Sequence, residues 1–430
     1  MTTFAPVDPN GIVPVVGGRD AAAIARVLRT LATALTQDAT PTNYLADPAA
    51  TPSEISRILG RIRRPLADAR IIVQTSGSTT GQGNLVGLSP TNVLSSALAT
   101  LVTLADQPPP TTLAPATLDA ARSALPPAAR ATWVTGLPVH HIAGLQVLTR
   151  SLLADTEPII VDTAAGFDPA ALAAAAERHD GATRLYTSLV PTQLREVVAD
   201  FALARRIGER FDAILVGGAA LPPATARAAA QAGLNIVRTY GMSETGGGCV
   251  YDGRALPGVQ VSLTDVDAHG VGLIRLAGAM VVDGYLTDAT PTNPRHRLGH
   301  SILTSDLGEL TGGVLNVIGR ADDVIITGGA NVSPQAVEQL LSDAGLEGII
   351  VGVPDPRWGE RLTFVTTTPG TTLDQVRAAL GTRPAEQRPR AIVTLPALPE
   401  RGPGKIDRRR IASLAAARLA SGEGESRDPR

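Results

Sequence analysis

Cysteine, aromatic side chains, lysine and long apolar runs are all scarce in this 430-residue sequence. Cys249 is the only cysteine, which excludes an intrachain disulfide and a cysteine-rich metal cluster. Aromatic residues make up 3% of the chain, so its cores must be built from aliphatic side chains and alanine. The N-terminus lacks a basic segment followed by an apolar one, and no run of 18 apolar residues occurs. These absences predict a cytoplasmic protein without membrane insertion.

Charge is nearly balanced, at a net value of −2, and the basic residues form no long stripe. The two short basic clusters, at 61–64 and 408–410, do not amount to a nucleic-acid-binding surface, so we expect no nucleic-acid partner. Hydrophobic residues make up 44% and charged residues 18% of the chain, which is typical of folded domains. A chain of this length predicts two or three of them.

Lys405 is the only lysine among the 38 lysine and arginine residues. Arginine is a wide planar fork, whereas lysine is a compact charge on a flexible stem that can reach a single atom. We therefore interpret Lys405 as a functional residue. The alternative is that a genome of high GC content replaced lysine by arginine elsewhere and spared this one by chance.

The first 240 residues alternate short Val/Ile/Leu runs with alanine-rich helical segments. Strands are predicted at 70–74, 132–135, 158–162, 184–187, 213–216 and 235–238. Helices are predicted at 20–35, 90–104, 168–179, 192–204 and 223–232. Strands that alternate with helices predict parallel sheets and an α/β fold class. Residues 105–130, which are rich in proline and alanine, are expected to form a surface excursion.

Glycine and proline become more frequent after Val250, and short strands at 259–263, 272–276 and 315–318 predict a compact β region. We place a domain boundary between residues 321 and 322. Residues 1–321 then form a large N-terminal domain of parallel α/β sheets plus the β region. Residues 322–430 form a small α+β domain, with a helix capped by Ser333. The last ten residues are expected to be disordered.

Residues 75–84, TSGSTTGQGN, lie between a predicted strand and a predicted helix. Their three glycines and five serine or threonine residues supply many N–H and O–H donors, a composition that suits a polyphosphate. The segment is not a Walker A loop, because its lysine is missing, and it does not fit GxGxxG. This disfavours a P-loop phosphotransferase. A plain hydroxyl-rich turn is the alternative.

Three further segments carry side chains suited to a nucleotide. In RTYGMSETGGG, Tyr240 lies next to a glycine that lets a ligand approach the backbone. Glu244 of the same segment offers carboxylate oxygens that suit Mg²⁺, or it is simply an acidic residue at a helix start. Asp306 lies between apolar residues and is placed to accept hydrogen bonds from a sugar diol. Arg320 and Asp322 lie at the predicted domain boundary, before a Gly-Gly turn.

Seven segments, in order and spacing, resemble the adenylate-forming superfamily of acyl- and aryl-CoA synthetases, luciferases and peptide-synthetase adenylation domains. They are 75–84, LPVHHIAG at 137–144, GGAAL at 217–221, YGMSETG at 240–246, SDLGEL at 305–310, GRADDVIITGGANVSP at 319–334 and GPGKIDRR at 402–409. The resemblance implies that ATP, Mg²⁺ and CoA take part in two-step chemistry. A carboxylate attacks the α-phosphate of ATP, the small mobile C-terminal domain rotates, and a thiol then attacks the acyl carbon.

The resemblance also implies a role for each matching residue. Lys405 would bridge the acyl carboxylate and the α-phosphate, Glu244 would bind Mg²⁺, and Asp322 would be the hinge. Asp306 and Arg320 would hold the ribose. The implied phosphate and adenine contacts are Thr75, Ser76, Gly77, Ser78, Thr79, Thr80, Gly217, Gly218, Ala219, Tyr240, Gly241 and Ser243. The family loop usually continues Gly-x-Pro-Lys-Gly, whereas here it reads GQGN, and Asn84 is the candidate that rebuilds the grip.

The segments LPVHHIAGLQVL, YTSLVPTQLREV and YGMSETGGGCVYDG resemble the o-succinylbenzoate–CoA ligases of menaquinone biosynthesis. This resemblance implies that His141 acts at a gating position beside the acyl pocket. It also implies 2-succinylbenzoate as substrate, whose second, aromatic carboxylate needs a donor; Arg195 or His140 is the candidate. The other implied pocket residues are Ser188, Thr192, Gln193, Gly246, Gly247 and Gly248.

Three alternatives stay open at this point. The chain could be another aryl- or acyl-CoA ligase of the same superfamily, or a catalytically inactive nucleotide-binding relative, which only the altered phosphate loop favours. The His pair at 140–141 could be no more than a solvated strand end. The expected partners are the small-molecule substrates, and the sequence leaves a homodimer open.

Overall fold

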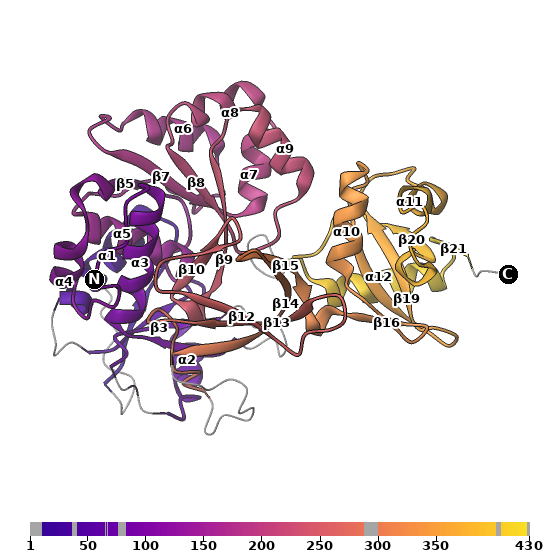
Figure 1. Cartoon of the computed structure of the whole chain (residues 1–430), viewed down its shortest axis with the longest axis horizontal. Helices are drawn as coiled ribbons and strands as arrows, with labels where there is room; N and C mark the ends of the chain where they lie inside the picture. Colours follow the sequence, from indigo (N-terminus) through magenta and orange to yellow (C-terminus); the bar gives the residue numbers. More distant parts are fainter. Residues whose placement is uncertain are drawn as a thin grey trace.

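The computed structural model describes residues 11–36, 41–64, 66, 68–75, 83–287, 300–400 and 406–427. These residues form four β-sheets with helices packed against them (Figure 1). In Figure 1, α10, α11, α12 and their strands lie together at the right, beside the larger remainder of the chain. Within the ranges just given, none of the helices combines the length and the apolar character that a membrane crossing requires.

The first sheet is built by the start of the chain. Its strands, in spatial order, are β1 (Val13–Val16), β2 (Asn43–Ala46), β3 (Ile71–Gln74) and β4 (Leu85–Leu88). The first three are parallel, and β4 runs antiparallel to β3. The connecting helices are α1 (Ala21–Thr36) and α2 (Pro52–Leu59). The carboxyl ends of the parallel strands therefore meet at one edge, where residue 75 begins the glycine-rich loop.

The second sheet has seven strands in the order β11–β10–β9–β8–β7–β5–β6. They are β5 (Ala131–Thr135), β6 (Ile159–Ile160), β7 (Arg184–Leu189), β8 (Ala213–Val216), β9 (Ile236–Met242), β10 (Gly247–Tyr251) and β11 (Arg254–Ala255). The strands from β5 to β9 are parallel, and β10 returns antiparallel to β9. This order makes the second sheet the centre of the larger part of the molecule.

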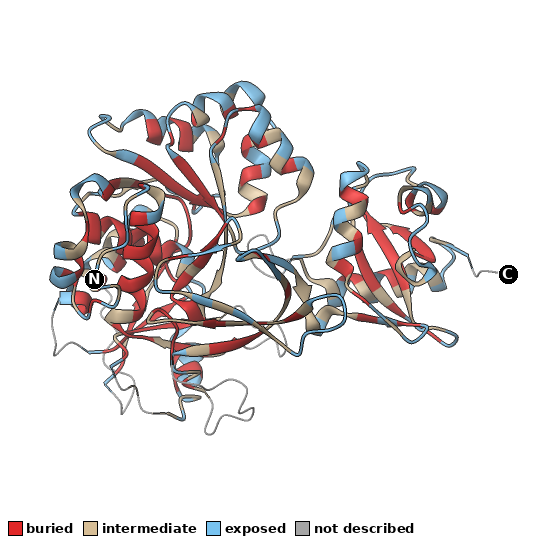
Figure 2. Ribbon diagram, in the orientation of Figure 1, coloured by how far each residue is buried: buried red, intermediate tan, exposed pale blue. Residues whose placement is uncertain are grey.

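Helices cover both faces of the second sheet. They are α3 (Pro90–Leu104), α4 (Leu118–Ala124), α5 (Ile142–Ala154), α6 (Pro169–Glu177), α7 (Pro191–Val198), α8 (Phe201–Gly208) and α9 (Pro223–Gln231), with short 3-10 turns η1 (Pro127–Ala129) and η2 (Ser243–Thr245). Alternate residues along a strand point to opposite faces. Trp133 joins the core under α3 and α5, whereas Val134 joins the core under α6 to α9. Figure 2 accordingly shows buried strands, with exposed residues on the outer sides of α6, α8 and α9, whereas α3 and α5 are mostly buried.

The third sheet is antiparallel and lies below the second in Figure 1. Its strands are β12 (Gln260–Thr264), β13 (Val271–Ala277), β14 (Ser301–Thr311) and β15 (Val314–Arg320). The pairing of β14 with β15 places Asp306 opposite Arg320. This register brings together two residues that the sequence places 14 positions apart.

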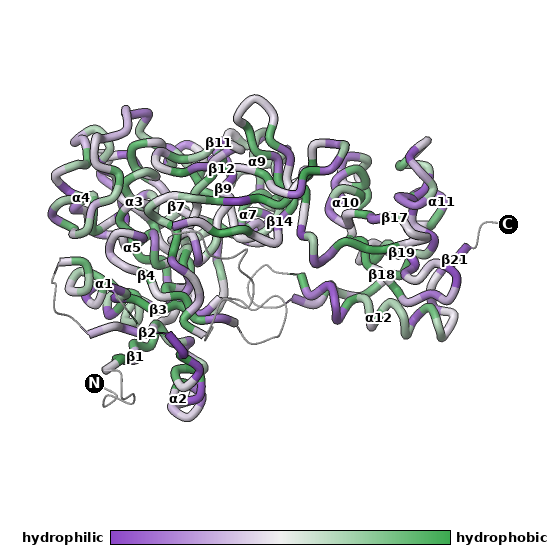
Figure 3. The backbone as a smooth tube through the Cα atoms, turned by 60° about the horizontal axis from the view of Figure 1, so that its bottom comes forward, coloured by the Kyte–Doolittle hydropathy of each residue, from purple (hydrophilic) through white to green (hydrophobic). Residues whose placement is uncertain are grey.

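The fourth sheet belongs to the C-terminal part. Its strands are β16 (Ile325–Thr327), β17 (Ala330–Val332), β18 (Ile349–Asp355), β19 (Gly359–Thr366), β20 (Ala391–Thr394) and β21 (Glu425–Ser426). The accompanying helices are α10 (Pro334–Asp343), α11 (Leu373–Ala379) and α12 (Arg408–Ala420), with 3-10 turns η4 (Ala321–Asp323) and η5 (Ala385–Gln387). In Figure 3, β18 and β19 stand out as hydrophobic strands, and their side chains form separate cores with α10 and α12. The predicted boundary between residues 321 and 322 falls within η4.

The predicted α/β class with parallel sheets is confirmed. Three local predictions are wrong. The helix predicted at 192–204 is two helices, because Asp200 accepts a hydrogen bond from the Leu203 backbone and starts α8 afresh. The surface excursion at 105–130 contains α4, whose Leu118 and Ala121 are buried. The C-terminal tail is ordered through residue 427, because β21 pairs with β20.

Candidate active site

Predicted site residues gather where the parallel strands of the second sheet end. Ser188 lies near the end of β7, residues 217–219 follow β8, and Tyr240 lies in the second half of β9. Ligands of open parallel sheets bind outside the carboxyl ends of the strands. The fold therefore brings three predicted segments to the edge at which a ligand is expected.

Gly217 lies against the neighbouring strand where β8 ends. A Cβ on Gly217 would lie 2.2 Å from Thr239 Oγ1, so only glycine allows β9 to pass this closely. Gly218 has a φ of 85°, a conformation that favours glycine, and both Gly218 and Ala219 are exposed. The backbone predicted to contact adenine is therefore accessible beside Tyr240.

Tyr240, Asp306 and Arg320 form one hydrogen-bonded group that joins the second and third sheets. The Tyr240 hydroxyl donates to Asp306 Oδ2 at 2.7 Å, and Arg320 Nη1 lies 3.4 Å from Asp306 Oδ1. Arg320 Nη2 also donates to Asp322 Oδ2 at 2.9 Å. The side chain of Asp306 is 13% exposed. A carboxylate has about four acceptor positions, so Asp306 keeps acceptor capacity for a ligand hydroxyl.

Burial controls the protonation of this group. Burial raises the pKa of Asp306, against the lowering effects of the Tyr240 hydrogen bond and the Arg320 charge. Burial and the Asp306 carboxylate both raise the pKa of Tyr240, so its hydroxyl stays protonated as a donor. The arrangement suits a sugar diol, which can donate to the carboxylate while Arg320 holds it in place.

Glu244 is buried in η2, directly after β9. Tyr285 donates its hydroxyl to Glu244 Oε1 at 2.6 Å, and the Val282 N–H donates to the Glu244 carbonyl. The described ranges contain no group of three His, Cys, Asp or Glu residues that could hold a metal by themselves. Mg²⁺ is usually held by one or two carboxylates together with substrate phosphates and water, so a single oriented carboxylate fits it.

His140 and His141 lie between β5 and α5, and His141 is the N-cap residue of α5. His140 is 7% exposed and packs on Gly17, where an added Cβ would come within 2.5 Å of His140 Cβ. Its Nε2 lies 3.7 Å from Asp47 Oδ2, and its ring centroid is 4.4 Å from that of His141. Burial lowers the pKa of His140, with Asp47 opposing and Arg19 adding to this effect. The His pair is therefore not a solvated strand end.

Glycines in β9 and in the β9–β10 turn allow close packing with β10 and α5. A Cβ on Gly241 would lie 2.2 Å from the Gly247 carbonyl oxygen, and one on Gly247 would lie 2.9 Å from Gln146 Cγ. Gln146 Nε2 donates to the carbonyl of Gly246 at 2.5 Å. A Cβ on Gly248 would lie 2.9 Å from the ring of Tyr251. Because these residues have no side chain, α5 and Tyr251 pack directly against the turn.

The sequence analysis did not single out Arg150, one helical turn beyond Gln146 on α5. It is 3% exposed, and its guanidinium lies 4.9 Å from the Trp133 ring centroid. Its Nη2 donates to the Tyr251 hydroxyl at 3.4 Å, and among the described residues no carboxylate pairs with it. Burial lowers its pKa, although arginine stays charged in proteins. An arginine within the apolar helix LQVLTRSLLA was the available sequence signal.

Arg150 is one of several residues with an unsatisfied buried polar atom. In the part of the chain that the structure describes, several buried atoms have no hydrogen-bond partner: Ser95 Oγ, Ser96 Oγ, Trp133 Nε1, Thr135 Oγ1, Gln146 Oε1 and Arg150 Nε. Ser96 Oγ also lies 3.4 Å from the Cβ position of Gly247. Buried polar groups are normally paired, so Ser96, Gln146 and Arg150 keep unused hydrogen-bonding capacity on α3 and α5.

The candidates on β7 and α7 divide into buried and exposed residues. Ser188 is buried and Thr192 is half-buried. Gln193 Oε1 accepts from the Val190 N–H at 3.1 Å and thereby caps the start of α7. Arg195 is exposed on α7, and in the described ranges it forms no hydrogen bond or ion pair. The structure thus gives Arg195 no link to the other site residues.

Part of the predicted site lies outside the described residues, namely Ser76, Gly77, Ser78, Thr79, Thr80 and Lys405. The ends of the glycine-rich loop are described. The Thr75 N–H donates to the Asn84 carbonyl, and the Asn84 N–H donates to Thr75 Oγ1, both at 2.9 Å. Thr75 and Asn84, at the two ends of the loop, are therefore hydrogen-bonded to each other next to β3 and β4.

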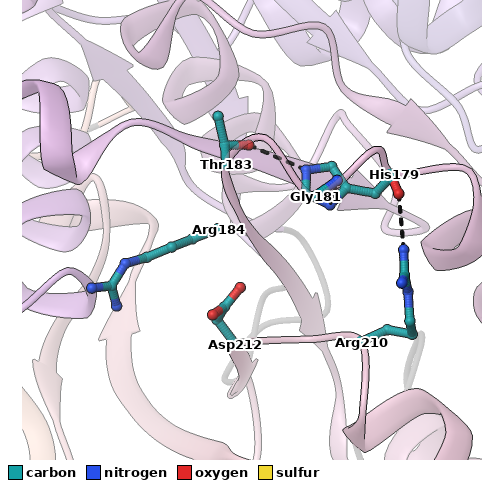
Figure 4. Close-up of a pocket in the computed structure, with 6 residues that line it drawn as sticks. All are labelled: His179, Gly181, Thr183, Arg184, Arg210 and Asp212. Atoms are coloured by element: carbon teal, nitrogen blue, oxygen red, sulfur yellow. Dashed lines mark hydrogen bonds between the residues drawn. The ribbon is translucent and has the colours of Figure 1, made fainter.

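A cavity of about 340 Å³ lies elsewhere, at the amino ends of β7 and β8 (Figure 4). It is lined by His179, Gly181, Thr183, Arg184, Arg210 and Asp212. His179 bonds to Thr183 Oγ1 and accepts from the Gly181 N–H, and Arg210 donates to the His179 carbonyl. Asp212 accepts from the Leu185 N–H. These groups serve the local fold, at the sheet edge opposite the candidate site.

Comparison with known proteins agrees with this geometry. A family model described as AMP-binding enzyme matches residues 19–286. The chain is 40% identical over 287 residues to a probable 2-succinylbenzoate–CoA ligase of Mycobacterium tuberculosis (strain CDC 1551 / Oshkosh), covering 64% of this chain and 73% of the relative. It is 30% identical over 295 residues to the 2-succinylbenzoate–CoA ligase of Lactococcus lactis subsp. lactis (strain IL1403), covering 65% and 61%.

The fold is also that of a solved structure. O-succinylbenzoate CoA synthetase (MenE) from Bacillus subtilis, in complex with the acyl-adenylate intermediate OSB-AMP, superposes with a TM-score of 0.74. The match covers 94% of this chain and 88% of that one at 19% sequence identity. At this identity the likeness bears on the fold alone.

Proposed function

Because the chain belongs to the AMP-binding enzyme family, we propose that it is an ATP-dependent acid–CoA ligase that converts 2-succinylbenzoate to its CoA thioester in menaquinone biosynthesis. The observation that carries the ligase assignment is the group formed by Tyr240, Asp306 and Arg320 at the carboxyl edge of the central sheet. The two named relatives support the choice of acid.

In the first step, a carboxylate oxygen of the acid attacks the α-phosphorus of ATP. The bond from that phosphorus to the bridging oxygen breaks, and pyrophosphate leaves. Tyr240 and the backbone at 217–219 hold the adenine, and Asp306 with Arg320 holds the ribose. Glu244 would hold Mg²⁺, which neutralises phosphate charge when it is bound. Lys405 would stabilise the negative charge as it passes between carboxylate and phosphate.

In the second step, the CoA sulfur attacks the acyl carbon. The bond between that carbon and the phosphate-linked oxygen breaks, AMP leaves, and the thiol proton passes to solvent. We propose that Asp322 is the hinge about which residues 322–430 turn between the two steps. His141 would stand at the acyl group, with its backbone at the first turn of α5 and its ring against His140.

We assign the aromatic carboxylate of the substrate to Arg150, in place of Arg195 or His140. A buried charge without an opposite charge beside it is costly, so a guanidinium of this kind points to an anionic ligand. The unpaired Ser96 hydroxyl would add a donor. This assignment explains why the substrate would be a dicarboxylate.

Product analysis tests the proposal. The enzyme should convert ATP, CoA and 2-succinylbenzoate, in the presence of Mg²⁺, to AMP, pyrophosphate and a thioester. Liquid chromatography measures these products. Release of ADP and phosphate would contradict adenylation. Equal turnover of benzoate or of medium-chain fatty acids would instead favour another aryl- or acyl-CoA ligase. No turnover with any acid, although the protein binds ATP, would favour an inactive nucleotide-binding relative.

A further inference from the structure

Tyr251, the last residue of β10, bonds through its hydroxyl to side chains of both α3 and α5. From α5, Arg150 Nη2 donates to the hydroxyl oxygen at 3.4 Å. From α3, Thr100 Oγ1 lies 2.9 Å from the same oxygen. All three residues are buried. One hydroxyl therefore joins a strand and two helices around a buried charge.

The hydrogen bonds of this group can run in only one direction. Thr100 Oγ1 donates to the Ser96 carbonyl at 2.9 Å, so the single proton of this hydroxyl is used there. Arginine has donors only, so Tyr251 must accept from Arg150. A buried donor left unpaired is costly, so Tyr251 gives its own proton to Thr100. The result is one chain of hydrogen bonds from the guanidinium to the Ser96 carbonyl, in which both hydroxyl protons are used.

This direction decides what Tyr251 can do for an anionic ligand. Its only proton is used by Thr100, so its hydroxyl has no donor to offer a carboxylate. Its oxygen instead holds one edge of the Arg150 guanidinium, while the Trp133 ring centroid lies 4.9 Å from the same group. Among the described residues, Arg150 Nε has no hydrogen-bond partner. Tyr251 and Trp133 thus orient an arginine that still has donor capacity for a ligand.

The Tyr251 hydroxyl lies beside Gly248, one of the implied pocket residues. A Cβ on Gly248 would lie 3.5 Å from the hydroxyl oxygen of Tyr251. The tyrosine ring itself belongs to the buried core that α3 and α5 share, and phenylalanine would keep those contacts. The core therefore accounts for the ring. What the hydroxyl adds is an acceptor for the Arg150 charge, next to the predicted acyl pocket.

We propose that Tyr251 and Thr100 are positioning residues for substrate specificity: they orient the Arg150 guanidinium toward the aromatic carboxylate of 2-succinylbenzoate and do not contact that carboxylate themselves. This role rests on the proposed function, in which Arg150 binds that carboxylate. Without the Tyr251 acceptor, the guanidinium keeps its charge and its contact with Trp133 but can turn about its stem. Binding of the dicarboxylate should therefore weaken, while an acid without the aromatic carboxylate should be unaffected.

The test uses the full-length enzyme and compares 2-succinylbenzoate with 4-oxo-4-phenylbutanoate, which lacks the aromatic carboxylate. Tyr251→Phe removes the acceptor and keeps the ring. Thr100→Val removes the hydroxyl that receives the Tyr251 proton, in a side chain of the same shape, and Thr100→Ser keeps a hydroxyl there. The rate of AMP release gives kcat and KM for each acid, and thermal melts monitor folding.

Tyr186→Phe is the matched control. Tyr186 is also buried, and its ring centroid lies 5.2 Å from that of Trp133. Its hydroxyl donates to the Leu104 carbonyl at 3.1 Å, outside the chain of hydrogen bonds that reaches Arg150. This variant therefore removes one buried tyrosine hydroxyl beside the same tryptophan without removing an acceptor from the arginine.

We expect the KM for 2-succinylbenzoate to rise roughly 3- to 10-fold in Tyr251→Phe, the scale for one hydrogen bond, with kcat within about twofold of wild type. Thr100→Val should shift KM in the same direction, and Thr100→Ser should stay near wild type. The constants for 4-oxo-4-phenylbutanoate, and all constants of Tyr186→Phe, should match wild type. In an Arg150→Met background, Tyr251→Phe should cause no further loss, since both act through the same guanidinium.

Three results would each overturn the positioning role: an unchanged KM in Tyr251→Phe, equal losses for both acids, or a further loss in the Arg150→Met background. An Arg150→Met enzyme that discriminates between the two acids as wild type does would instead overturn the assignment of Arg150. Wild-type enzyme that turns over neither acid would overturn the proposed function itself.

Discussion

Arg150→Met is the substitution that distinguishes most sharply between a structural and a substrate-binding arginine. Methionine keeps much of the length of the side chain and packs against Trp133 without a charge. If Arg150 served the fold, its loss should destabilise the protein. Among the described residues, Arg150 contacts one hydroxyl and one aromatic ring and pairs with no carboxylate. Replacing a buried charge by an apolar side chain is often neutral or stabilising, so we expect an unchanged or higher melting temperature.

The effect on substrate should be large and selective. A hydrogen bond to a charged group contributes about 1.5–3 kcal/mol, which corresponds to roughly 10- to 10²-fold in kcat/KM. We expect this loss for 2-succinylbenzoate. We expect little change for 4-oxo-4-phenylbutanoate, which has the same reacting carboxylate but lacks the aromatic one. A coupled assay of AMP release measures both.

Arg122→Met is the matched control. Arg122 donates to the Leu152 carbonyl near the end of the same helix and pairs with Asp155, remote from the glycine turn. The Arg122→Met substitution should leave kcat/KM unchanged for both acids. An Arg150→Met enzyme that discriminates the two acids as well as wild type does would refute the assignment. A large drop in melting temperature with equal losses for both acids would point to a structural arginine instead.

Three further substitutions test other parts of the site. Asp322→Pro restricts φ at the proposed hinge, so adenylate formation should survive while thioester formation falls. Equal loss of both half-reactions, measured in separate assays, would mean that the hinge is elsewhere. Burial raises the pKa of Asp306, so the folded state binds this proton more tightly than the unfolded chain and stability falls as pH rises above the unfolded value of about 3.9. At neutral pH the melting temperature of Asp306→Asn should therefore be higher than that of wild type, and this difference should shrink in acid. The KM of the variant for ATP should rise. A difference in melting temperature that does not depend on pH would contradict this reasoning. Lys405→Ala should slow pyrophosphate exchange roughly 10²–10³-fold, and Lys405→Arg should stay strongly impaired, whereas near wild-type exchange in the arginine variant would make the lone lysine an accident of codon usage.

Local signals in the sequence predicted much of the fold. Ser89 followed by Pro90 predicts the start of α3, and the structure has Ser89 accepting from the Asn92 N–H there. The strand predicted at 213–216 is β8, and the helix capped by Ser333 is α10. These elements have strong caps or uninterrupted apolar runs, so their neighbours in sequence determine them.

Other features depend on contacts that sequence neighbours do not reveal. The tail looked disordered because it is polar, yet Glu425 accepts from the Leu373 N–H and Arg427 donates to both oxygens of Asp374. The helix predicted at 192–204 runs across Asp200, whose side chain in the structure caps α8 and so divides the segment into two helices.

The candidate site shows the same division. The grouping of Tyr240 with Asp306 follows from two motifs that could be read in the sequence. An arginine within an apolar helix was the signal for Arg150 in the sequence, but the lack of a carboxylate partner is apparent only in the described structure.

The central claim is that this chain forms an acyl-adenylate, and oxygen-isotope transfer tests it most directly. 2-Succinylbenzoate labelled with ¹⁸O in its succinyl carboxylate would be turned over with ATP, Mg²⁺ and CoA. Attack by a carboxylate oxygen on the α-phosphorus must leave that oxygen on the nucleotide when the thioester forms. The account predicts AMP that carries one ¹⁸O atom, measured by mass spectrometry. Label in inorganic phosphate, or thioester formation with unlabelled AMP, would contradict it.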